Sequence, residues 1–209
     1  MNSFANQVSF LVITAFFEPL MPTIDRIKAL LKIPATAKWR LDRAPLDLTR
    51  PGFSQPKRGG ALPISVSVWS PASRPELTAF CAHSEDGWGH FVGKISAANG
   101  PESISVRSTA TDEPWGLQEV SYRKPGSYWP ARIVQWLQEE DGYKFLDEGE
   151  PFGFENDLNP DPRKRIATRA DVLRFVNRFG IDLDNKNFWK SDVEAIYLQE
   201  VRDNISPSK

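Results

Sequence analysis

Three residues in the middle of the chain could bind a metal ion or supply a nucleophile. Cys81 is the single cysteine, and His83 and His90 are the two histidines. They flank Asp86 and Gly87, a dipeptide that strongly favours a two-residue hairpin turn. In such a hairpin His83 lies opposite His90. Cys81 then shares their face, because successive side chains of a strand point to opposite sides.

A Cys-His-His set is a reasonable zinc or copper site, and an imidazole beside a thiol can create a Cys–His nucleophile pair. The spacing C-x-H-x6-H matches no established metal motif, however. A register slip of one residue would also move these side chains to opposite faces. The alternative that we favour is a buried Cys81 beside a cross-strand pair of His83 and His90. The three residues therefore stay metal-ligand candidates only.

The other common signatures of enzymes are absent from the sequence. It has no phosphate-binding loop and no glycine-rich dinucleotide fingerprint after a strand. It also lacks a G-x-S-x-G nucleophile elbow and an H-E-x-x-H zinc motif. We therefore expect a non-enzymatic protein that needs no cofactor.

The most distinctive stretch is acidic and aromatic, and it covers residues 139–157. Its single base is Lys144; its eight carboxylates are Glu139, Glu140, Asp141, Asp147, Glu148, Glu150, Glu155 and Asp157, and its aromatic residues are Tyr143, Phe145, Phe152 and Phe154. A glycosidase-like pair of carboxylates is conceivable, but most of these acids lie at expected turns, where solvated charge is normal. The pattern favours a contact surface for a basic protein.

The residues that we expect to contact this partner come mainly from the acidic stretch. Two tryptophans in expected turns, within DGWG and EPWG, join them because tryptophan is enriched at binding hot spots. These tryptophans could equally cover the open ends of a sheet. The predicted contact residues are Glu139, Glu140, Asp141, Tyr143, Asp147, Glu148, Glu150, Trp88 and Trp115.

Composition limits the partner and the compartment. The 209 residues include 26 basic and 27 acidic side chains, so there is no overall basic excess to bind nucleic acid. A lone cysteine forms no intrachain disulfide, which fits a cytoplasmic location. The apolar residues 8–17 are too few to span a membrane, which takes about 20. They lack a preceding basic region, so a buried strand or docking segment is favoured over a signal peptide, unless translation starts at Met21.

The remaining pattern predicts a single α+β domain over residues 1–209, with a mostly antiparallel sheet. Alternation and turn signals place about seven strands at residues 64–69, 77–84, 88–95, 103–107, 118–123, 132–139 and 143–146. One helix is expected at residues 24–32, and another follows a capping box at Thr168 and Asp171. A last helix should begin after Ser191 or Asp192.

Residues 35–62 are expected to form an irregular, basic and proline-rich arm, because proline interrupts helices and interior strands. The arm is either a solvated linker or a contact for a phosphate or an acidic partner. If it touches the acidic stretch, that stretch is already neutralised.

Three classes of function remain. The first is a protein-binding protein, for example a bacterial immunity or inhibitor protein that neutralises a basic enzyme. The second is a small metalloprotein or thiol enzyme built on Cys81, His83 and His90. The third is a structural or assembly protein that docks through residues 1–20.

Overall fold

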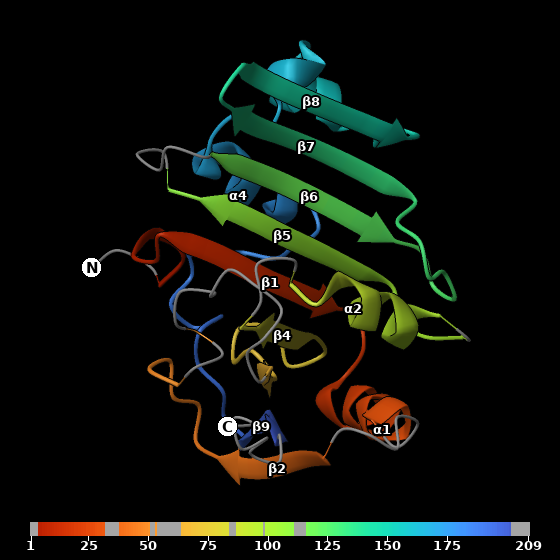
Figure 1. Cartoon of the computed structure of the whole chain (residues 1–209), viewed down its shortest axis with the longest axis vertical. Helices are drawn as coiled ribbons and strands as arrows, with labels where there is room; N and C mark the ends of the chain where they lie inside the picture. Colours follow the sequence, from red (N-terminus) through yellow and green to blue (C-terminus); the bar gives the residue numbers. More distant parts are fainter. Residues whose placement is uncertain are drawn as a thin grey trace, which may run out of the picture.

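The fold is built on one large antiparallel sheet (Figure 1). The computed structural model describes residues 4–31, 38–50, 53, 64–83, 87–97, 99–110 and 116–201. Within them, nine strands lie in the order β2-β9-β3-β4-β1-β5-β6-β7-β8. Their bounds are β1 Phe10–Phe16, β2 Lys38–Ala44, β3 Ser65–Trp69, β4 Thr78–Ala82, β5 Ser103–Thr109, β6 Leu117–Arg123, β7 Arg132–Glu139, β8 Gly142–Gly149 and β9 Ala195–Val201.

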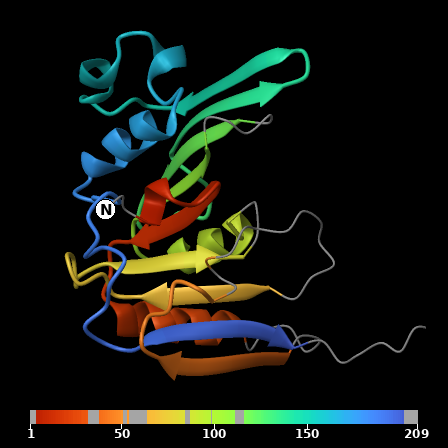
Figure 2. The same ribbon diagram turned by 90° about the vertical axis from the view of Figure 1, so that its left-hand side faces the viewer.

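The helices cover the two faces of the sheet unequally (Figures 1 and 2). Helices α1 (Leu20–Leu31) and α2 (Gly89–Ser96) lie on one face, over the half that contains β3, β4 and β9. Helix α4 (Arg169–Asn177) packs on the other face against β5 and β6, next to the short helix α3 (Glu155–Leu158). Two short 3-10 helices, η1 (Phe4–Asn6) and η3 (Pro162–Lys164), complete the described elements.

Strand β1 occupies the centre of the sheet. It pairs with β4 on one side and with β5 on the other. Leu11, Ile13 and Ala15 belong to the core beneath α4, whereas Phe16 belongs to the core beneath α1 and α2. A strand covered on both faces needs apolar residues at consecutive positions. The expectation that residues 8–17 contain a buried strand is thereby confirmed.

Much of the predicted secondary structure is confirmed, and the α+β class holds. The expected strands at residues 64–69, 103–107, 118–123 and 132–139 correspond to β3, β5, β6 and β7. The helix after Thr168 forms as α4, with Thr168 and Asp171 exchanging the two hydrogen bonds of a capping box. The N-terminal helix also forms, although it begins at Leu20 rather than at residue 24.

Two element assignments are wrong. Residues 89–96 form helix α2 instead of the second strand of a hairpin. Phe91, Val92 and Ile95 are spaced for one face of a helix, and all three are buried in the same core cluster as Phe80. Conversely, the expected last helix is strand β9. Its residues Ala195–Leu198 are buried at four consecutive positions between β2 and β3, so both faces of this strand are covered.

The proline-rich arm is only partly irregular. Residues 38–44 form β2, which pairs along its whole length with β9 at one edge of the sheet. Phe53 is buried beside Trp69 in the core beneath α4. The most proline- and glycine-rich part of the arm, residues 54–63, lies outside the described residues. One of the seven expected strands is helix α2, and β1, β2 and β9 are additional strands, so the described sheet has nine strands.

Candidate binding face and acidic hairpin

Beyond β1, one face of the sheet is not covered by any described helix (Figure 1). The sequence of β5 explains this face: Ile104 and Val106 point into the core beneath α4, so Ser105 and Arg107 point to the opposite side. Pairing along β1, β5, β6 and β7 then aligns polar residues across the sheet. They are Thr14, Ser105, Arg107, Glu119, Ser121, Arg123 and Gln135.

A row of three hydrogen-bonded side chains crosses the centre of this open face. The Arg107 guanidinium forms a two-point ion pair with Glu119, its neighbour across β5 and β6. The amide of Gln135 donates a hydrogen bond to the same carboxylate at 2.6 Å. Glu119 is only 12% exposed, so most of its charge is neutralised by Arg107 rather than by water.

Arg123 is the second cation of the open face, and it is more deeply buried. It is 7% exposed, and within the described part of the chain no carboxylate lies within ion-pair distance. Its Nε donates to the carbonyl oxygen of Tyr128 at 3.3 Å, and its Nη1 donates to the Ser105 hydroxyl at 3.5 Å. Burial lowers the pKa of Arg123, although the negative charge of Glu119 acts in the opposite direction. The guanidinium is therefore a poorly compensated charge.

These side chains line a hollow of about 340 Å³ in the open face. Its polar lining includes Ser105, Ser121 and the two arginines, and its apolar lining includes Pro130, Ile133 and Leu146. Helix α2 supports one wall. A Cβ on Gly93 would lie 2.7 Å from the Tyr128 carbonyl oxygen, so glycine allows the close approach that places this carbonyl beside Arg123. A partly apolar hollow with a few polar groups is typical of a ligand site.

Strands β7 and β8 form a hairpin that projects from the body of the protein at the sheet edge (Figure 2). The dipeptide Asp141-Gly142 predicts a turn at these two residues. Glu139 instead pairs with Gly142, so Glu140 and Asp141 form the two-residue turn, one position earlier. Tyr143 is 65% exposed and stacks on Trp136 with ring centres 4.6 Å apart. This aromatic pair gives the charged hairpin a rigid apolar patch.

The eight carboxylates of the acidic stretch fall into two groups. Six of them lie outside the arginine network that binds Asp147 and Glu155. Glu139 pairs with Lys144, and Asp157 pairs with Arg178. Within the described residues, four further carboxylates form no ion pair. These are the exposed Glu140, Asp141, Glu148 and Glu150.

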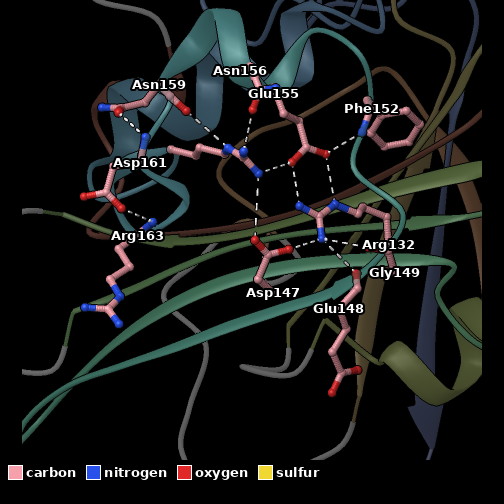
Figure 3. A network of polar contacts seen from close by, with 11 residues as sticks. Arg132, Asp147, Glu148, Gly149, Phe152, Glu155, Asn156, Asn159, Asp161 and Arg163 are labelled. Atoms are coloured by element: carbon pink, nitrogen blue, oxygen red, sulfur yellow. Dashed lines mark hydrogen bonds and ion pairs between the residues drawn. The ribbon is translucent and has the colours of Figure 1, made fainter.

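The second group, Asp147 and Glu155, forms a charge network beneath the hairpin, in which Glu155 is buried and the Asp147 side chain is 24% exposed (Figure 3). Arg132 binds both oxygens of Glu155 and also pairs with Asp147. Arg165 donates to Glu155 at 3.0 Å, and the backbone N–H of Phe152 donates to it at 2.9 Å. Arg132 is 2% exposed and Glu155 is fully buried.

This network joins β7 and β8 to α3 and the segment that follows it. Two arginines compensate two carboxylates, so Asp147 and Glu155 neutralise internal charge rather than adding to the acidic surface. The sequence pattern did not indicate this, because the bases come from outside the acidic stretch. The acidic stretch is therefore only partly neutralised. Among the described residues, the bases that pair with its carboxylates do not come from the arm at residues 35–62.

The predicted cluster of Cys81, His83 and His90 depended on the hairpin that does not form. Cys81 lies in the core beneath α4, where its thiol donates to the Val12 carbonyl oxygen at 3.1 Å. His90 lies on α2, over the opposite face of the sheet, and its Nδ1 contacts the Tyr128 hydroxyl. Within the described residues, no group of three or more His, Cys, Asp or Glu side chains is placed to hold a metal ion.

The two tryptophans predicted as contact residues lie away from the hairpin or outside the described structure. Trp88 precedes α2 and stacks on Phe91 with ring centres 3.9 Å apart, and it also packs on Trp39. It thus extends the core beneath α1 and α2. Trp115 falls in residues 111–115, outside the described residues.

The residues of the open face were not singled out from the sequence. Arg107, Glu119, Ser121 and Arg123 sit in strands whose alternation was recognised. A signal was present, because the non-core positions of both strands carry serine and charged residues. That pattern indicates an uncovered sheet face.

Comparison with protein families, curated proteins and solved structures returned no match for this chain. Among the described residues, every helix is too short or too polar to cross a membrane.

Proposed function

We propose that this protein is a non-enzymatic binding protein, and that it recognises a basic protein through the β7–β8 hairpin. The observation that carries the proposal is a hairpin with four exposed carboxylates and, next to its turn, the exposed and stacked Tyr143. Glu140, Asp141, Glu148 and Glu150 form no ion pair among the described residues. A basic partner would supply the missing counter-charges, which accelerates association and selects the partner.

The position of the hairpin supports this proposal. Strand β8 is the last strand of the sheet, so one of its edges has no neighbouring strand in the described structure. Charged side chains on such an edge discourage unspecific pairing with other strands. The same charges leave the surface open to a partner of opposite charge. Tyr143 adds an aromatic anchor of the kind that dominates many interfaces.

One concrete version is a bacterial immunity or inhibitor protein that neutralises a basic enzyme in the cytoplasm. Asp147 is left out of the proposed contact, because Arg132 already binds it. Trp88 is left out as well, because it packs on Trp39 and Phe91. Glu139 is retained although it pairs with Lys144, because Lys144 is itself 72% exposed and this pair lies at the surface. The proposed contact residues are therefore Glu139, Glu140, Asp141, Tyr143, Glu148 and Glu150.

The alternative functions have less support. Burial raises the pKa of the Cys81 thiol to about 12, so this thiol is a poor nucleophile at neutral pH. The assembly hypothesis relied on a free docking strand in residues 1–20. Strand β1 is instead paired on both sides within its own chain, and its removal would take out the centre of the sheet.

Charge reversal tests the proposal. A partner is first isolated with the wild-type protein and identified, and its affinity is then measured with purified components at several salt concentrations. The variant Glu148→Lys with Glu150→Lys should bind at least about tenfold more weakly, with most of the loss in the association rate. The matched control is Asp192→Lys with Glu194→Lys, which makes the same charge change at exposed residues before β9. Equal affinity of the hairpin variant and the wild type would remove the hairpin from consideration.

A further inference from the structure

The hollow in the open face contains one positive charge more than it contains negative charges. Its ionisable lining residues are Arg107, Glu119 and Arg123. Arg107 and Glu119 neutralise each other through their two-point ion pair. The charge of Arg123 therefore remains, on a side chain that is more than nine-tenths buried. A buried charge without a partner is costly, so an anion that enters the hollow gains a strong interaction.

Hydrogen-bond donors are also available there. A guanidinium has five N–H groups, and the Arg123 side chain makes only two hydrogen bonds within the described structure, to Tyr128 and Ser105. The Ser105 hydroxyl also bonds to Thr14 at 2.8 Å. The Ser121 hydroxyl, which lies next to Ser105 across the strands, makes no hydrogen bond with the described residues. Arg123 and Ser121 both line the hollow, so two side chains with unused donors border the same space.

We propose that this hollow binds a small organic carboxylate. Arg123 donates to the carboxylate oxygens, Ser121 adds a hydroxyl donor, and Pro130, Ile133 and Leu146 contact the apolar part of the ligand. The Tyr128 carbonyl holds the Arg123 guanidinium in place through Nε. The site shares Ile133 and Leu146 with the β7–β8 hairpin, but none of the proposed contact residues lines it, so neither proposal depends on the other.

The charge and the size of the hollow select this ligand class. A carboxylate carries one negative charge, which matches the single uncompensated charge of Arg123, and its two oxygens fit a guanidinium. A phosphate monoester carries about 1.5 to 2 charges at neutral pH, and the second charge would face Glu119 without a partner. A volume of about 340 Å³ is at the lower end for ligand sites, so the ligand has the size of one ring or a short chain.

The test compares three ligands that share one ring and differ only in the head group. Benzoate, phenyl phosphate and benzamide are titrated into the full-length wild-type protein, and amide shifts are followed by nuclear magnetic resonance. Benzoate should give saturable shifts centred on Ser105, Ser121 and Gln135. Phenyl phosphate should bind more weakly, and benzamide should give no saturable shift at the same concentrations.

Two arginine variants then assign the interaction. Arg123→Gln should weaken benzoate binding by about tenfold or more, the value of a lost charge-assisted hydrogen bond. Arg163→Gln removes the same charge at an exposed residue of η3 and should leave benzoate binding unchanged. If Arg123→Gln fails to fold, the head-group comparison on the wild-type protein decides alone. Absence of benzoate binding at millimolar concentration, equal binding of benzamide, or tighter binding of phenyl phosphate would each overturn the proposal.

Discussion

Replacement of Glu155 by glutamine should destabilise the protein strongly. Glu155 is fully buried and accepts hydrogen bonds from Arg132, Arg165 and the backbone N–H of Phe152. The amide of the introduced glutamine would keep one acceptor oxygen but turn N–H donors toward an arginine, which has only donors. Of the carboxylates in the described part of the chain, Asp147 alone would then remain for the two buried arginines.

The expected loss of unfolding free energy follows from the buried arginine charge that the substitution leaves without compensation. Breaking a buried ion pair by removing one partner costs about 3–5 kcal/mol, because the other charge stays buried without compensation. With a urea dependence at the upper end of about 1–3 kcal/mol per M, the midpoint of unfolding should fall by about 1–2 M. Equilibrium urea unfolding followed by tryptophan fluorescence and circular dichroism measures this shift.

Asp157→Asn is the matched control, because it removes the same charge from the same helix. The Asp157 side chain is 71% exposed and lies 3.7 Å from Arg178, so its loss should change stability by less than about 0.5–1 kcal/mol. The double variant Glu155→Gln with Arg165→Gln should lose less unfolding free energy than the sum of the two single-variant losses, because the two residues are in direct contact. A loss for Glu155→Gln no larger than that of Asp157→Asn would refute the assignment of the network as a stabilising tie.

Two further predictions concern the wall of the hollow and the buried thiol. Gly93→Ala should destabilise the protein, because its Cβ would lie 2.7 Å from the Tyr128 carbonyl oxygen. Gly89→Ala on the same helix meets nothing within 4 Å and should not destabilise it. Equal thermal midpoints of the two variants would contradict this packing. Burial raises the pKa of Cys81 to about 12, whereas an unfolded thiol titrates near about 8.5. The folded state is thus favoured most below about pH 8.5, and this contribution falls as the pH rises toward 12 because the unfolded thiol ionises first. Iodoacetamide should accordingly modify Cys81 quickly in urea and very slowly in the native protein at pH 8; rapid native modification would show that the thiol is accessible.

The sequence determined the elements whose patterns are local. Two-residue alternation indicated β3, β5, β6 and β7, and a capping box indicated the start of α4. The acidic hairpin was also recognisable, because a turn dipeptide stood between two alternating runs. In each of these cases the residues that decide the structure lie within a few positions of one another.

Short apolar runs were assigned less well. Residues 89–96 and 195–201 each contain a few apolar residues next to polar ones, a pattern compatible with helix or strand. The tertiary structure decided between them. Phe91 and Ile95 pack as one helical face on a finished sheet, whereas Ile196 and Tyr197 are buried on opposite faces of that sheet.

Only the tertiary structure decided which charged residues meet. Arg132 and Arg165 both reach Glu155 through the arrangement of the hairpin and the α3 segment, and Arg123 reaches Ser105 through the pairing of β5 and β6. The strand order β2-β9-β3-β4-β1-β5 likewise joins segments from opposite ends of the chain. Composition and spacing specify which residues are present on a strand or a helix. Whether a carboxylate is a free surface charge, as at Glu148, or a buried counter-ion, as at Glu155, depends on distances set by folding of the whole chain, and electrostatic energies follow those distances and the burial that accompanies them.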